Sequence, residues 1–322
     1  MARRRKKSRS SKLDSVMTIP FAISGAGETA TDTIDISQCA SLVNRRFYRQ
    51  GLEWAVAGIT VLSDDQGTIN LQKLPDTWMC DNGYTKAYHA WKRQQDDVIE
   101  EAGAESAVAA FRDFKVHMDV THVTAGFANN LLPIGYGGAG YPIGEWEASN
   151  IVVPNVLADA SGSTVDPTEY MLHVTGINNN GGVSRGIIEG YADSRAYPQS
   201  PDPVSPGLDS DNNWLRNMFD VGNDSSEIVD NATDTNDELP YDQINYPGGQ
   251  TIAPFLEVSD QAIASATTIG GKTSLKGSNY KCGLIRVSHH FPVPSNPEVP
   301  NVVLFLHLVP GNHRGYLAER MT

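Results

Sequence analysis

Short β-rich segments separated by glycine and proline constrain the fold of this chain more than any other feature. The 322 residues include 29 Gly and 18 Pro, which are residues that end strands and form turns. Between them, polar and apolar residues alternate with the period of two that marks a half-buried strand, most clearly at residues 31–37. We predict strands over residues 16–23, 31–37, 52–62, 68–74, 111–123, 145–153, 169–175, 184–191, 280–291 and 302–309.

Several of these segments also predict their place in a sheet. Pro20 lacks an N–H for a sheet ladder, so residues 16–23 should form an edge strand. Residues 302–309 are almost all apolar and should be central, paired with the beginning of the chain. Residues 52–62 and 68–74 flank a turn and predict a hairpin, with Trp54, Val56 and Gly58 on one face.

One stretch has helical rather than strand periodicity. Residues 83–103 should form a helix that Asp81 or Asn82 caps and Gly103 ends, with a further helical turn over residues 104–110. The residues on its buried face lie three or four positions apart: Tyr84, Tyr88, Trp91, Gln95, Val98 and Ala102.

These elements favour an all-β fold, a single jelly-roll β-sandwich with an eight-stranded core, a helical insertion and long surface loops. An immunoglobulin-like sandwich is the alternative, although the chain is long for it and the helix is unusual there. We expect a disordered basic arm at residues 1–14 and a jelly-roll domain at residues 15–322. Residues 198–249 should form an acidic loop insertion on the outer surface, since residues 209–242 hold ten acidic residues and one basic residue, Arg216.

The first twelve residues form a polycation that cannot fold alone, because they contain no core-forming residues. The whole chain has 25 Lys or Arg and 38 Asp or Glu; without the seven basic residues of the arm, 18 minus 38 leaves a net charge of −20 on the body. Such a body repels nucleic acid, so binding should fall to the arm and one local patch. The arm also has the composition of a nuclear import signal. Its basic residues are Arg3, Arg4, Arg5, Lys6, Lys7, Arg9 and Lys12.

The local patch is the cluster of Arg45, Arg46 and Arg49. Guanidinium groups bind phosphate, and the interleaved Phe47 and Tyr48 could stack on unpaired bases. The alternative is that the arginines pair with carboxylates of a neighbouring subunit while the aromatic rings enter the core.

Cysteine and hydropathy patterns exclude other classes of protein. Cys39, Cys80 and Cys282 have no metal-ligand spacing and are odd in number, which predicts free, buried thiols of a reducing compartment. No stretch reaches the roughly 18 consecutive apolar residues of a membrane span, so we predict no membrane insertion.

Catalytic and metal motifs are also missing from the sequence. His289 and His290 are adjacent in a predicted strand and should point to opposite faces, as should His117 and His122. Residues 209–213 begin like a calcium loop, but Trp214 occupies the glycine position, which favours a solvated charge run. There is no nucleophile elbow or phosphate loop. We therefore predict no metal, no cofactor and no enzymatic activity.

Three features of the sequence resemble a known family. The short basic start, the stretch Asn-Arg-Arg-Phe-Tyr-Arg-Gln-Gly at residues 44–51 before a strand, and Pro-Asp-Thr-Trp at residues 75–78 before an aromatic helix are similar to capsid proteins of small circular, replication-initiator-encoding single-stranded DNA viruses (CRESS-DNA viruses, circovirus-like). The resemblance covers residues 1–119. It implies one jelly roll, an icosahedral shell, a lumenal arm on the packaged genome and nuclear import of the free subunit. The arm is shorter than is common in circoviruses.

Two functions of different class follow from these observations. The first is a capsid protein that self-assembles into a small icosahedral shell and packages single-stranded DNA. Its partners would be copies of itself, the genome and the host nuclear import machinery, and its locations the virion and, during assembly, the host nucleus. Small RNA viruses also combine jelly rolls with basic arms, so the type of genome rests on the resemblance. The second is a non-viral sandwich that binds carbohydrate or protein and carries a nuclear import tail.

Overall fold

The computed structural model describes residues 14–104, 113–135, 137–155, 166–195, 226–227, 230–231, 255–265, 267, 269–295 and 300–321. The basic residues of the predicted arm, nearly all of the predicted acidic insertion and most of the predicted helical turn at residues 104–110 lie outside this range.

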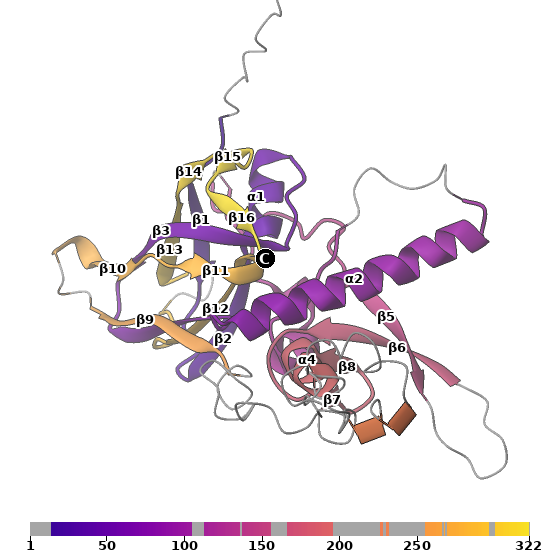
Figure 1. Ribbon diagram of the computed structural model, residues 1–322. Helices are drawn as coiled ribbons and strands as arrows, with labels where there is room; N and C mark the ends of the chain where they lie inside the picture. The colour runs from indigo at the N-terminus through magenta and orange to yellow at the C-terminus, as the bar shows by residue number, and fades with distance from the viewer. Residues whose placement is uncertain are drawn as a thin grey trace, which may run out of the picture.

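Two antiparallel sheets form the larger part of the structure (Figure 1). The structure is thus mostly β, and it is compatible with the predicted all-β sandwich. The first sheet has the order β1 (Thr18–Ile23), β13 (Val302–Leu308), β3 (Leu52–Ser63), β10 (Lys272–Lys276). The second has the order β2 (Thr29–Asp35), β12 (Leu284–His290), β4 (Gly67–Lys73), β9 (Glu257–Ala264). Shorter strands β11 (Asn279–Tyr280) and β16 (Ala318–Arg320) also pair with β3, and β14 (Pro310–Gly311) pairs with β15 (Gly315–Tyr316).

The strands pair in a nested order, in which early strands join late ones. β1 pairs with β13, β2 with β12, β3 with β10 and β4 with β9, each time antiparallel. β1 lies at the edge of its sheet and β13 lies between β1 and β3. The edge position of the Pro20 strand and the central position of the apolar late strand are both confirmed.

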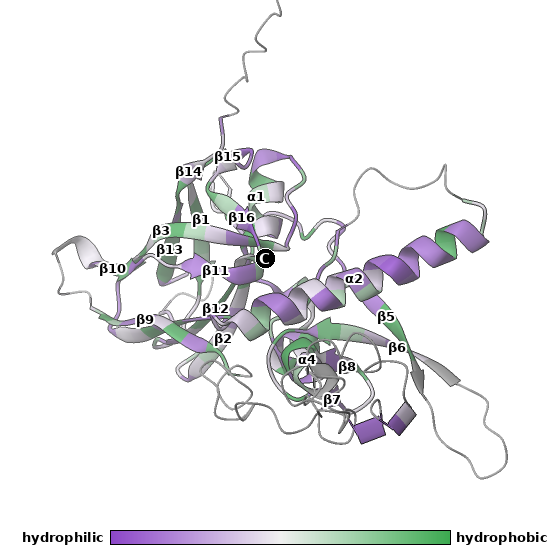
Figure 2. Ribbon diagram, viewed as in Figure 1, coloured by the Kyte–Doolittle hydropathy of each residue, from purple (hydrophilic) through white to green (hydrophobic). Residues whose placement is uncertain are grey.

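The main hydrophobic core belongs to these sheets. Every second residue of β13 is buried, and the same alternation in β1 buries Ile19, Phe21 and Ile23. Figure 2 shows hydrophobic residues in β1, β3 and β13 and hydrophilic residues along much of the long helix α2. Removal of this apolar surface from water is the main stabilising term.

The predicted hairpin is wrong. β3 and β4 belong to different sheets, so the turn between them carries the chain across the sandwich. The predicted placement of Gly58 is wrong too. His307 pairs with Gly58 and Leu308 with Val56, which leaves Ala57 as a bulge. The buried face therefore changes from Trp54 and Val56 to Ile59 and Val61.

Two helices begin at residues whose side chains cap their first turn. α1 (Ile36–Asn44) begins at Asp35, whose carboxylate accepts hydrogen bonds from the backbone N–H groups of Ser37 and Gln38. α2 (Trp78–Glu101) begins five residues earlier than predicted, because Thr77 and not Asp81 or Asn82 is its cap. Its second half extends beyond the sandwich (Figure 1), and Val98, predicted to be buried, is 56% exposed.

A second layer packs beside the sandwich, and several predictions within it need correction. Residues 111–123 do not form one strand, since α3 (Val120–Ala125) begins within them at the Asp119 cap. Residues 184–191 turn from strand to helix after Gly186, where Ile187 and Ile188 pack against α2 instead of a sheet. A turn at residues 181–183 joins the short strands Asn179–Asn180 and Ser184–Gly186. The layer contains the sheet β5 (Asn150–Asn155), β6 (Asp166–His173), β8 (Ser184–Gly186), β7 (Asn179–Asn180), and helix α4 (Ile187–Arg195). Short 3-10 helices lie at Phe127–Asn129, Ile269–Gly271 and Lys281–Gly283.

The segment that follows α3 also covers two free strand edges. The N–H of Leu131 donates to the Thr33 carbonyl of β2 at 2.8 Å, and the N–H of Ile134 donates to the Pro20 carbonyl of β1 at 2.9 Å. An unpaired edge is a template for unwanted pairing, so this segment closes one side of the sandwich.

Candidate nucleic-acid interface

The basic loop begins where α1 ends. Arg45 adopts the left-handed conformation (φ 54°), and its N–H donates to the Ser41 carbonyl, which closes the helix. The chain then turns across the end of the sandwich. Arg45 and Arg49 are exposed, and Arg46 is half-buried.

The two aromatic residues of this loop differ in exposure. Tyr48 is fully buried, with its ring centroid 5.9 Å from that of Trp54 and 5.5 Å from that of Tyr316. Its hydroxyl donates to the Arg314 carbonyl at 3.1 Å. The prediction that Tyr48 stacks on bases is therefore wrong, and the alternative that it enters the core holds for this residue. Phe47 is half-buried.

Arg314 joins the basic loop from the far end of the sequence. It lies in the β14–β15 turn with φ 48°, is exposed, and its guanidinium donates to the Phe47 carbonyl. The sequence-based prediction missed it, because a single arginine in a turn gives no local signal of its neighbours. We call Arg45, Arg46, Arg49 and Arg314 the arginine cluster.

The root of the N-terminal arm is fixed at the same place. Arg46 Nη1 donates to the Asp14 carbonyl at 3.2 Å and to Ser15 Oγ at 3.5 Å. Ser15 Oγ in turn donates to the Arg314 carbonyl at 2.8 Å. Figure 1 shows the first described residues beside α1 and the β14–β15 hairpin. The chain therefore enters the folded domain next to the arginine cluster.

The charge of the cluster is open to solvent. None of its four arginines forms an ion pair with another residue in the described ranges. Burial lowers the pKa of the adjacent His313, and the charges of Arg314 and Arg49 lower it further, so this ring is neutral at pH 7. Guanidinium groups that form no ion pair can bind phosphate oxygens with paired hydrogen bonds.

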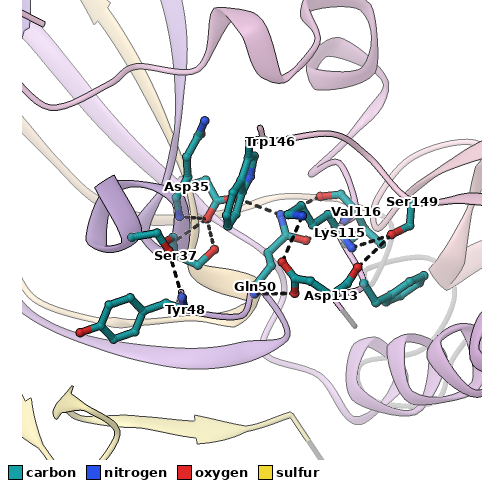
Figure 3. Close-up of polar contacts among 12 residues, drawn as sticks. Asp35, Ser37, Tyr48, Gln50, Asp113, Lys115, Val116, Trp146 and Ser149 are labelled. Atoms are coloured by element: carbon teal, nitrogen blue, oxygen red, sulfur yellow. Dashed lines mark hydrogen bonds and ion pairs between the residues drawn. The ribbon is translucent and has the colours of Figure 1, made fainter. Parts of the chain in front are cut away.

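A buried polar network holds Gln50, the residue that follows Arg49 in the basic loop (Figure 3). Asp35 is fully buried and accepts hydrogen bonds from Gln50 Nε2 at 3.1 Å and Trp146 Nε1 at 3.0 Å, besides those from the start of α1. Gln50 also exchanges two hydrogen bonds with the backbone of Val116, at 2.6 and 3.0 Å. Gln50, the residue next to Arg49, is thus held by two separate segments of the chain, around Asp35 and around Val116.

Other candidate residues are placed differently from the prediction. His117 and His122 do not point apart; their ring centroids are 4.8 Å from each other, because α3 turns the chain back between them. His289 is buried and His290 is exposed, as predicted. The three cysteines are free and buried, also as predicted.

The described residues contain no group of three or more His, Cys, Asp or Glu that could hold a metal ion. Within the same ranges, no helix is long and apolar enough to cross a membrane. No protein-family model, no curated protein and no solved structure matches this chain significantly.

Proposed function

We propose that this chain is the capsid protein of a small single-stranded DNA virus, and that it assembles into an icosahedral shell whose genome contacts the basic arm and the arginine cluster. The arm would also direct the free subunit to the host nucleus through the import machinery. The role is structural and needs no catalysis.

The strand pairing supports a jelly roll as the finer description of the fold. A jelly roll forms when a long antiparallel ribbon wraps around a barrel, so that its strands pair in nested order and divide between two four-stranded sheets. The nested pairs β1–β13, β2–β12, β3–β10 and β4–β9 have this order. The layer with α2 and α4 is then an insertion between β4 and β9.

The single observation that carries the nucleic-acid role is the convergence of the arginine cluster with the root of the arm. Arg46 holds Asp14 and Ser15 at the end of the sandwich where Arg45, Arg49 and Arg314 are exposed. In a body of net charge −20 this end has the right chemistry for a polyanion. Many weak arms in one closed shell would act together on a single genome.

Assembly is the first test, because the alternative function is a monomeric sandwich that binds carbohydrate or protein. Size-exclusion chromatography with light scattering and negative-stain electron microscopy of the purified full-length chain should show closed particles that contain nucleic acid. Nuclease digestion of the extracted nucleic acid distinguishes DNA from RNA. A chain that remains monomeric at all concentrations and salt conditions would refute the capsid proposal and favour the alternative.

The arginine cluster makes its own prediction. Replacement of Arg45, Arg49 and Arg314 by Ala should weaken binding to single-stranded DNA and reduce the slope of log K against log salt by about 2, because each phosphate contact contributes about 0.7. Filter binding measures this slope between about 50 and 200 mM salt, the range over which phosphate contacts weaken.

A matched control removes the same charge elsewhere. Lys92, Lys272 and Lys276 are exposed residues of α2 and β10, and their replacement by Ala should leave the salt slope nearly unchanged. Equal effects of the two triple variants would show that only net charge matters and would contradict a binding role for the cluster.

A further inference from the structure

Three buried histidines meet where the second layer contacts the sandwich. His117, His122 and His173 are 2%, 1% and 0% exposed. The His117 ring stacks on Phe127 at 4.3 Å and meets His122 edge-on at 4.8 Å. His117 and His173 pair through a backbone bridge that links the segment before α3 to β6. We call these three residues the histidine cluster.

The hydrogen bonds of His122 require a neutral ring. Its Nδ1 accepts from the Met118 N–H at 3.0 Å, and its Nε2 lies 2.9 Å from Asn130 Oδ1, to which it donates. Asn130 Nδ2 continues the chain to Gln38 Oε1 at 2.9 Å, in α1 of the sandwich. A proton on Nδ1 would remove the bond to Met118 and place two N–H donors face to face.

The other two rings have buried nitrogens without partners among the described residues. Both nitrogens of His117 and Nδ1 of His173 make no hydrogen bond there, while His173 Nε2 donates to the Ile177 carbonyl at 2.9 Å. A neutral imidazole tolerates such a site far better than a charged one.

The charged side chains around the histidine cluster would not stabilise protonated histidine rings. Arg286 approaches from β12, and its side chain is only 5% exposed. The nearby carboxylate of Asp119 already accepts from Arg286 at 2.6 Å and from the His122 N–H at 2.8 Å. Glu189 of α4 is a second nearby carboxylate, and it already accepts from the Asn178 N–H at 2.6 Å.

The pKa shifts of the three histidines predict how the stability of the fold changes with pH. Burial lowers the pKa of His117 to about 3 and of His122 to about 4, and it lowers that of His173 as well. For groups with a lowered pKa, the stability they provide is full above the ordinary pKa of 6.5 and is lost as the pH falls toward the folded-state value. Asp35 has the opposite effect on the pH dependence of stability. Burial raises its pKa to about 6, so the stability that the protonated group provides is lost as the pH rises from 3.8 to about 6.

We propose that the histidine cluster is an acid-sensitive latch: when protons enter it, the second layer, which includes residues 113–125 and 166–195, separates from the sandwich and from the segment 127–135 that covers its edges, before the sandwich unfolds. The contacts broken first would be those of His122 with Met118 and Asn130. The latch is a property of the folded chain and does not depend on the proposed shell function.

Hydrogen exchange of the purified full-length chain, followed by mass spectrometry from pH 7.5 to pH 3.5 and corrected for intrinsic rates, tests the order of events. Amides of residues 113–125 and 166–195 should lose protection at a higher pH than those of β1, β3 and β13. Simultaneous loss of protection in both regions, or earlier loss in the sandwich, would overturn the proposal.

Two variants connect this transition to the cluster. His117→Phe keeps the ring stacked on Phe127 and removes one protonation site, so the midpoint should move down by about half a pH unit or more. His290→Phe changes an exposed histidine of β12 and should not move it. An unchanged midpoint in His117→Phe would overturn the proposal.

A measurement on the unaltered protein covers the case in which His117→Phe does not fold. NMR of the histidine ring carbons should show the three buried rings neutral until the layer separates. Titration of all three near pH 6.5 in the intact fold would refute the latch.

Discussion

Deletion of residues 1–12 should abolish the proposed packaging of nucleic acid while the domain of residues 15–322 still folds. The arm holds seven of the 25 basic residues, and the remaining body has a net charge of −20, so no comparable contact replaces it. At about 0.7 per phosphate contact, loss of seven cations should reduce the salt slope of single-strand binding by about 5. The absorbance ratio of purified particles and filter binding against salt measure these effects.

Two control variants separate charge from sequence in the arm. An arm of the same length with every Lys and Arg replaced by Gln should behave like the deletion. An arm with the same residues in reversed order should package normally, because binding of a polycation to a polyanion depends on its charge and not on the order of its residues. Particles of the deletion variant with normal nucleic-acid content would refute the role of the arm.

Replacement of Asp35 by Ala should destabilise the fold more than any surface substitution, by about 3–5 kcal/mol. The change leaves the side chains of Gln50 and Trp146 and the N–H groups at the start of α1 without their shared acceptor in a fully buried site. Each unsatisfied buried donor costs about 1–3 kcal/mol, and the costs do not simply add because the donors belong to one network. Urea unfolding monitored by tryptophan fluorescence measures the loss.

The matched control is Asp64→Ala, at an exposed position in the turn between β3 and β4. Its effect on the free energy of unfolding should stay within about 0.5 kcal/mol. A loss below about 1 kcal/mol for Asp35→Ala would mean that water or rearranged side chains satisfy the network. The loop with Arg49 would then not depend on Asp35.

Local patterns allowed prediction of much of the sheet structure. The alternation of buried and more exposed residues in β4 and β13 reflects which face of a strand is buried, and neighbours in sequence report that directly. The same patterns failed where tertiary contacts decide. Residues 184–191 alternate enough for a strand, but Ile187 packs against Gly83 of α2, where a Cβ would lie only 3.3 Å from it. Glycine at position 83 permits this close contact between two helices.

The candidate site was predictable only in part, for a similar reason. The cluster of Arg45, Arg46 and Arg49 is visible in the sequence, whereas Arg314 contacts Phe47 across 267 positions. The exposure of Phe47 and Tyr48 could not be read from composition either. An aromatic residue next to arginine fits a base-stacking surface and a core equally well until the ring's neighbours are known.

The sequence alone determined six strands of the sandwich (β1, β2, β3, β4, β12 and β13), the edge and central strands that Pro20 and residues 302–309 specify, and the charge contrast between arm and body. These properties depend on the residue types and on near neighbours in the chain. Only the tertiary structure decided that β3 and β4 lie in different sheets, that Arg314 joins the root of the arm, and that His117 and His122 face each other. Those outcomes depend on which distant segments bury surface together, and many pairings of similar strands satisfy the same local pattern.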